Sequence, residues 1–164
     1  IEGETLGERL RAKVQLPVPE ACGIALQLAL AMAQLHSAGI VYSDLKPRKI
    51  MLSAAPDVHG GQRAILLCTL NAKVEGTESA AAASRLMRLS GTPLYMPPEQ
   101  WQSTAAQSRK SDVYALGILL YQMLTGSEPF VGTDELAIAK AHADTPLPPL
   151  EHPTVDVRAP TLPA

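Results

Sequence analysis

Two long apolar segments with helical spacing constrain the fold of this 164-residue chain more than any other feature. Between residues 20 and 37, apolar side chains recur every three or four positions, which predicts a helix that is apolar over most of its surface and mostly buried. Residues 112–125 are equally apolar, with Ser111 as the expected N-cap and Gly126 as the expected C-terminal stop. Aromatic residues make up only 4% of the chain, which also favours helices over sheet. The sequence therefore predicts a mainly α fold.

Two shorter apolar runs predict a small β-hairpin. Residues 50–52 and 64–67 are short enough to be strands. The intervening residues 53–63 contain Pro56, Gly60 and Gly61, which is typical of a loop. We therefore expect a hairpin near residues 50 to 67 beside the helices.

The second half of the chain contains one further predicted helix and two segments without strong periodicity. A third helix is predicted to begin after Thr133, with Asp134 and Glu135 in its first turn, and to end near His142. Residues 146–164 are rich in proline and have no apolar period, which predicts a poorly ordered tail. Residues 74–88 are rich in Ala, Ser and Glu, and we expect them to be flexible or weakly helical.

Charge and cysteine content exclude some classes of function. The net charge is −2 and no basic stripe is present, so nucleic acid is not an expected partner. Cys22 and Cys68 lie far apart, which suits a reducing compartment and predicts a cytoplasmic protein. The longest apolar stretch, residues 21–35, is interrupted by Gln27 and Gln34 and is shorter than the ~20 residues of a membrane helix. We expect a core helix there and no membrane segment.

Residues 35–50 contain the first recognisable motif. Their sequence resembles the end of a protein kinase helix that runs into the catalytic loop, which in that family reads H-R-D-x-x-x-x-N. Tyr42, Ser43 and Asp44 stand at the H-R-D positions, and Lys49 stands at the asparagine position. Ser43 replaces an arginine that, in many kinases, pairs with a phosphorylated activation segment. Tyr42 is expected to pack in the core.

Two further segments resemble the same family in the same order. Residues 91–99 are similar to the end of an activation segment, with Pro97, Pro98 and Glu99 at its A-P-E motif. Residues 111–130 resemble the central helix of the kinase C-lobe and the turn after it. The resemblance covers residues 1–145 and is strongest to bacterial Ser/Thr kinases of the eukaryotic type. It implies a C-terminal lobe without the Gly-rich loop and strand lysine of the N-lobe.

The resemblance implies roles for particular residues. Asp44 matches the catalytic base, Lys46 matches the lysine that stabilises the transferred phosphoryl group, and Thr92 matches a threonine that helps to hold these two. Asp112 resembles the helix aspartate that accepts hydrogen bonds from the catalytic loop, and His36 is expected to be a satisfied core histidine. The base machinery of a Ser/Thr kinase is therefore expected to persist.

The implied magnesium ligands are replaced. Cys68 stands at the aspartate of the D-F-G motif, and Lys49 stands at the asparagine that holds the second ion. Magnesium prefers hard oxygen ligands, so neither residue suits it and no metal ligand is predicted. Lys49 could instead bind a nucleotide phosphate directly, together with Lys46. The simpler alternative is that Lys49 is a solvated surface lysine at a decayed position.

Three functions remain open on the sequence. The first is a pseudokinase that serves as a protein-binding or regulatory module, with ATP as a possible ligand. The second is a divergent active kinase that transfers phosphate from ATP to protein Ser or Thr by means of Asp44 and Lys46. The third is a gene fragment without function.

Overall fold

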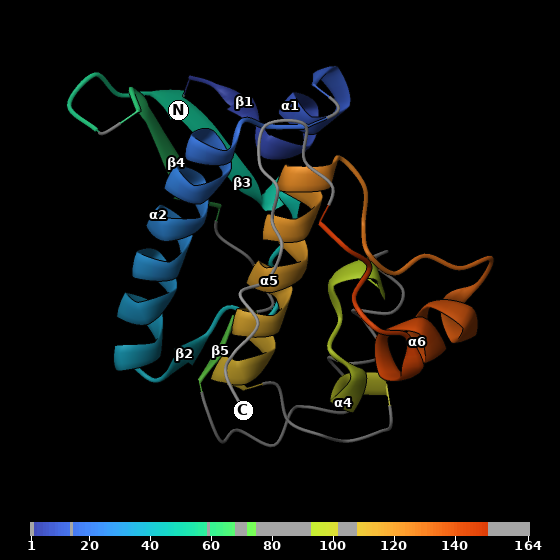
Figure 1. Cartoon of the computed structure of the whole chain (residues 1–164). Coiled ribbons are helices and arrows are strands. Elements are labelled where there is room, and N and C mark those ends of the chain that lie inside the picture. The colour runs from blue at the N-terminus through green and yellow to red at the C-terminus, as the bar shows by residue number, and fades with distance from the viewer. Residues whose placement is uncertain are drawn as a thin grey trace, which may run out of the picture.

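The computed structural model describes residues 2–13, 15–58, 60–67, 72–74, 93–101 and 108–150. Two long helices, α2 (Val18–Ser37) and α5 (Arg109–Thr125), run side by side through the molecule (Figure 1). A small sheet lies across one end of this helix pair, and a shorter helix, α6 (Glu135–Asp144), lies to one side. The prediction of a mainly helical fold with a small antiparallel sheet is confirmed.

The predicted hairpin is part of a three-stranded antiparallel sheet. Strands β3 (Ile50–Ala54) and β4 (Gln62–Leu66) pair with Leu52 opposite Ala64. The sequence pattern did not indicate the third strand, β1 (Glu4–Thr5), which pairs with the other edge of β3. A separate two-stranded pairing joins β2 (Ile40–Val41) to β5 (Lys73–Val74). Strands of two residues carry too little alternation to be recognised by period.

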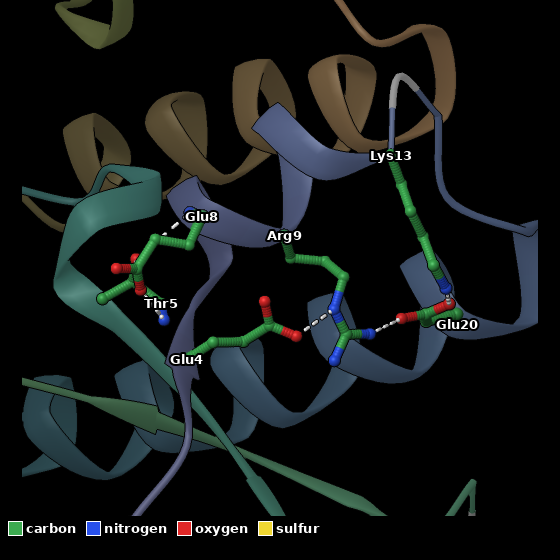
Figure 2. Close-up of polar contacts among 6 residues, drawn as sticks. All are labelled: Glu4, Thr5, Glu8, Arg9, Lys13 and Glu20. Carbon is green, nitrogen blue, oxygen red and sulfur yellow. Dashed lines mark hydrogen bonds and ion pairs between the residues drawn. The ribbon is translucent and has the colours of Figure 1, made fainter.

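A short helix, α1 (Leu6–Ala12), was also missed by the sequence analysis. It begins with a capping box, in which the Thr5 hydroxyl accepts a hydrogen bond from the Glu8 amide while the Glu8 carboxylate accepts one from the Thr5 amide. Figure 2 shows Arg9 between Glu4 of β1 and Glu20 of α2, with an Nε–Oε1 distance of 2.5 Å to Glu4. The spacing Thr-x-x-Glu before an apolar residue is a helix signal and could have revealed α1.

Helix α2 buries one face. Ala21, Ile24, Leu28 and Met32 are at most 2% exposed, at the three- and four-residue spacing of an amphipathic helix. Leu26 and Leu30 are 62% and 58% exposed, so the prediction that this helix is mostly buried is wrong. The predicted boundary at residue 37 is confirmed, and Pro19 lies in the first turn, where a missing amide costs nothing.

The length argument against a membrane helix also fails for α2. The helix has 20 residues and a mean hydropathy of 1.4, which by length and composition alone is sufficient to cross a membrane. A core helix meets the same criteria, and α2 packs against both α5 and β4. These contacts support the interpretation of α2 as a core helix.

Helix α5 begins three residues earlier than predicted. Ser108 is its N-cap and Ser111 lies at the third helical position, where it completes a capping box. Gly126 ends the helix in the left-handed conformation (φ 82°), as the sequence predicted and as a residue without Cβ favours. The core forms between α5, α2, the sheet and the loop after β2, from side chains that include Leu28, Leu45, Ile50, Leu52, Leu119 and Met123.

The remaining elements are short. They are the 3₁₀ turns η1 (Pro47–Lys49) and η2 (Pro93–Tyr95), helix α4 (Pro98–Trp101), and α6, which contacts α4 and η2. Asp134, predicted to lie in the first turn of α6, is its N-cap, so the helix begins at Glu135, one residue later than predicted. The predictions for residues 75–88 and 151–164 lie outside the described residues, and residues 145–150 are irregular.

Candidate functional site

The loop between β2 and β3 is held by a buried carboxylate in the first turn of α5. Asp112 is 1% exposed. Its Oδ2 atom accepts a hydrogen bond from the Tyr42 amide at 2.8 Å, and its Oδ1 atom accepts one from the Ser43 amide at 2.8 Å. His36 Nε2, at the end of α2, lies 2.8 Å from Oδ2. The structure thus confirms the prediction of a carboxylate that holds this loop. His36 has a hydrogen-bond partner, as predicted, but its side chain is 14% exposed and not fully in the core.

Ser43 is strained where Asp112 holds it. Among the described residues it is the one non-glycine residue with a positive φ, 69°. For a residue with a Cβ this conformation costs roughly 1–2 kcal/mol. Such strain persists only where surrounding contacts enforce it, and it concentrates at functional sites. Here the constraint is the hydrogen bond that the Ser43 amide donates to Asp112. Ser43 is the residue immediately before Asp44.

Tyr42 anchors the same loop to the end of β4. The side chain is 3% exposed and belongs to the hydrophobic core. Its hydroxyl donates a hydrogen bond to the Leu67 carbonyl at 2.7 Å. Packing of Tyr42 in the core is therefore confirmed, and the hydroxyl, which the sequence analysis gave no role, fixes the loop against the hairpin.

Asp44 and Lys46, two of the predicted catalytic residues, lie together. The Lys46 ammonium donates a hydrogen bond to Asp44 Oδ1, and each residue is 3% exposed. Burial lowers the pKa of Lys46, the Asp44 carboxylate opposes that effect, and the charges of Arg48 and Lys49 add to it. A carboxylate that can accept a proton thus lies against an ammonium that can stabilise an anion.

Lys49 lies three residues after this pair, at the end of η1. Its amide donates to the Lys46 carbonyl at 2.9 Å, and its carbonyl accepts from the Leu67 amide at 2.9 Å. These two bonds fix the backbone of Lys49 relative to both Lys46 and the end of β4. The Lys49 side chain is half-buried, whereas the neighbouring Arg48 is exposed.

The space beside Asp44 is small. A cavity of about 20 Å³ is lined by residues that include Asp44, Tyr95, Gln100 and Asp112, which is room for roughly one water molecule. On one side Tyr95 donates a hydrogen bond to Gln122 Oε1 at 2.7 Å, and burial raises the pKa of Tyr95. A substrate hydroxyl would need a rearrangement around Asp44 before it could enter.

The described part of the catalytic loop does not suit magnesium, which prefers oxygen ligands. Lys49 brings a cation to the position where the resemblance implies an asparagine, and the Asp44 carboxylate is paired with Lys46. Two other residues of the predicted site, Thr92 and Cys68, lie outside the described residues, so their predicted roles stay predictions.

A second concavity lies apart from this loop and was not predicted. It has a volume of about 380 Å³ and lies between α1, the start of α2 and the β3–β4 turn, with Arg9, Glu20, Gln27 and Gln62 in its lining. Gln27 bonds the outer edge of β4, since its Oε1 atom accepts from the Ala64 amide at 3.0 Å and its Nε2 atom donates to the Gln62 carbonyl at 3.1 Å. Gln27 interrupts an otherwise apolar helix, and this pattern could have indicated a polar contact at this position.

Known proteins are similar to nearly the whole chain. The family model described as "Protein kinase domain" matches residues 1–158. The serine/threonine-protein kinase RUNKEL of Arabidopsis thaliana is 35% identical over 150 residues, which is 90% of this chain and 10% of that protein. PknB of Mycobacterium leprae is 34% identical over 91% of the chain and 23% of its own length. PrkC of Bacillus subtilis is 33% identical over 94% of the chain and 23% of its own length. The chain spans less than a quarter of each.

Proposed function

Because this chain belongs to the Ser/Thr protein kinase family, we propose that it is a pseudokinase domain that serves as a protein-binding or regulatory module. The activity named for its relatives is that of serine/threonine-protein kinases. In the proposal, this chain keeps the architecture of the domain and part of its catalytic loop, and it lacks the metal-dependent step. Its partner is a protein, and its proposed location is the cytoplasm.

The observation that carries the proposal is the position of Lys49. Phosphoryl transfer needs cationic metal ions at the phosphate chain and acidic or amide oxygens to hold them. Lys49 is a half-buried cation whose charge is felt at Lys46. An ammonium about 4 Å from a divalent ion repels it by several kcal/mol even at an effective dielectric of ~20. The loop therefore disfavours the ion that the family reaction requires.

The buried network around Asp112 supports a role in binding. Asp112, His36 and the amides of Tyr42 and Ser43 join α5, α2 and the catalytic loop through hydrogen bonds of 2.8 Å. A module that binds a partner needs a fixed shape and no chemistry. The network fixes the shape of the loop, which a binding module needs as much as an enzyme does.

A divergent active kinase is the second candidate, and one contact favours it. The Lys46 ammonium is bonded to the Asp44 carboxylate. If the site opened to a substrate, Asp44 would accept the proton of a Ser or Thr hydroxyl. The hydroxyl oxygen would form a bond to the terminal phosphorus of ATP while the bond from that phosphorus to the bridging oxygen breaks and ADP leaves. Lys46 would then stabilise negative charge on the transferred phosphoryl group.

A phosphoryl-transfer assay on the full-length protein separates the two candidates. The readout is transfer of the labelled terminal phosphate of ATP to the protein itself and to a general basic protein substrate, in magnesium and in manganese. We expect no transfer above that of the Asp44→Asn variant. Transfer by the natural protein that Asp44→Asn abolishes would contradict the pseudokinase proposal and establish the active kinase.

A gain-of-function variant makes an inactive result informative. The double variant Lys49→Asn, Cys68→Asp restores the two residue types that the family uses for metal. If loss of these ligands is what silences the domain, the variant gains magnesium-dependent transfer, and adding Asp44→Asn removes it again. A variant that folds, binds ATP with magnesium and still transfers nothing would show that the defect lies elsewhere.

A further inference from the structure

The segment from Asp44 to Lys49 carries three cations and one anion. Lys46, Arg48 and Lys49 outnumber the Asp44 carboxylate of this segment together with the Asp112 carboxylate that holds the loop, so the loop is positive in a chain whose net charge is −2. A local positive excess on a negative molecule attracts ligands that carry several negative charges. The local charge therefore favours a polyanion at this loop.

Lys49 is the cation best placed to meet such a ligand. Its backbone is fixed on both sides, by the Lys46 carbonyl at 2.9 Å and by the Leu67 amide at 2.9 Å. A fixed backbone limits the directions that the side chain can take and so lowers the entropy lost on binding. Lys49 is half-buried, Lys46 is 3% exposed, and Arg48 is exposed. Lys49 is thus accessible to a ligand and still close enough for its charge to act on Lys46.

Lys46 and Lys49 can supply positive charge of the kind that magnesium supplies to a phosphate chain. A phosphate chain that enters an active site needs positive charge to offset its own, and a divalent ion or lysines can supply that charge. Lys49 stands where the resemblance implies an oxygen ligand, and Lys46 and Lys49 bring two ammonium groups to one short loop. Part of the positive charge that a phosphate chain needs can therefore come from the protein itself.

We propose that Lys49, together with Lys46, binds the phosphate chain of a nucleoside di- or triphosphate directly, without a divalent metal. The proposal rests on the proposed function, a domain that binds without transferring phosphate. In it, Lys49 makes the first contact with the phosphates, and the buried Lys46 joins once the ligand has entered. Free tripolyphosphate shares this chemistry, so the test must separate it from a nucleotide.

The test measures binding of a fluorescent ATP analogue, mant-ATP, to the full-length protein by anisotropy. In EDTA the natural protein is expected to bind, and excess magnesium is expected to weaken binding because the ion competes with Lys49 for the phosphates. The Lys49→Met variant should lose at least about tenfold in affinity in EDTA, since a charge-assisted contact is lost. Arg48→Met, the matched loss of one charge at the exposed neighbour, should change affinity by less than about threefold.

A second variant and two competitors complete the design. Lys49→Arg keeps the charge and should keep EDTA binding, which shows that a loss in Lys49→Met is not a folding defect. Unlabelled ATP should displace the probe more effectively than tripolyphosphate, and adenosine should not displace it. Equal displacement by tripolyphosphate would overturn the assignment to a nucleotide.

The remaining outcomes distinguish this inference from the proposed function. Unchanged EDTA affinity in Lys49→Met, or no binding of mant-ATP under either condition, would overturn the phosphate site and leave a protein-binding module standing. Binding that requires magnesium, accompanied by phosphoryl transfer, would overturn both proposals.

Discussion

Two buried aspartates, Asp112 and Asp44, show how differently this molecule uses the same side chain. Asp112 is 1% exposed. It accepts hydrogen bonds from two backbone amides and lies within hydrogen-bonding distance of a histidine nitrogen. Asp44 is 3% exposed and meets the ammonium of Lys46. The partners of Asp112 belong to two separate segments, the end of α2 and the loop after β2, whereas Lys46 is two residues from Asp44 in the same loop.

The difference separates architecture from chemistry. The contacts of Asp112 hold α5, α2 and the catalytic loop together, so they specify the tertiary structure. The contact of Asp44 with Lys46 is local and adds nothing to the connection between elements, yet it places an acid beside a cation. Buried ion pairs often contribute little net stability because desolvation offsets their attraction. In this molecule the architectural carboxylate is expected to matter most for stability.

The largest expected effect is that of Asp112→Ala. The substitution leaves the amides of Tyr42 and Ser43 buried without an acceptor, at roughly 1–3 kcal/mol each. We expect a loss of about 4 kcal/mol in the free energy of unfolding, measured by urea denaturation. Asp134→Ala is the matched control, because it removes an exposed helix N-cap whose loss costs about 1 kcal/mol. Equal losses in the two variants would contradict the architectural role of Asp112.

The next effect concerns the Asp44–Lys46 pair. Asp44→Asn or Lys46→Met leaves the partner's charge buried without its counterpart, so each single variant should lose about 3 kcal/mol of stability. The double variant removes both charges, so it should lose no more than a single variant, about 3 kcal/mol instead of the additive value of about 6, which is a coupling energy of about 3 kcal/mol in a double-mutant cycle. Additive losses would mean that the two charges do not depend on each other.

A third test extends the comparison to α6, where a neutral group is buried. His142 is 6% exposed, contacts Phe130, and its Nδ1 atom is hydrogen-bonded to the Tyr114 hydroxyl at 2.7 Å. Burial lowers the pKa of His142 from 6.5 to about 4, and burial also raises the pKa of Tyr114 to about 12. A neutral imidazole therefore helps to hold α6 against α5.

The sign of the pH effect follows from that lowered pKa. The unfolded chain binds the His142 proton first, so this contribution to stability is present above pH 6.5 and is lost as the pH falls through 4. We expect a loss on the order of 2 kcal/mol. In His142→Gln the fall in stability over this range should be smaller, and an unchanged pH profile would exclude His142 as its source.

The smallest expected effect is at Ser43. Its positive φ of 69° suits glycine, so Ser43→Gly should relieve strain, with a net gain of about 0.5 kcal/mol after the entropy cost of glycine. Gly126→Ala is the opposite change at a φ of 82° and should lose about 1 kcal/mol. Thermal unfolding of both variants measures the two shifts, and destabilisation by Ser43→Gly would show that the serine side chain itself is needed.

The sequence predicted much of this fold because its signals are local. The long apolar periods of α2 and α5, the left-handed Gly126 and the β3–β4 hairpin all follow from residues close together in the chain. The proximity of Asp44 to Lys46 was also predictable from a motif. The two-residue strands β1 and β5 were not, because pairing with a distant segment is what makes them strands.

The chain by itself determined where the two long helices lie, where α5 ends and which cations are present in the loop before β3. These features follow from periodicity, backbone preferences and charge, all of which act over a few residues. Only the tertiary structure decided which face of α2 is buried and that Gln27 bonds the edge of β4. The hydrogen bonds that Asp112 accepts from two amides some 70 positions away were predicted by the family resemblance and not by any local pattern. Such contacts depend on which distant surfaces pack against each other and exclude water. A local sequence pattern is compatible with several such packings.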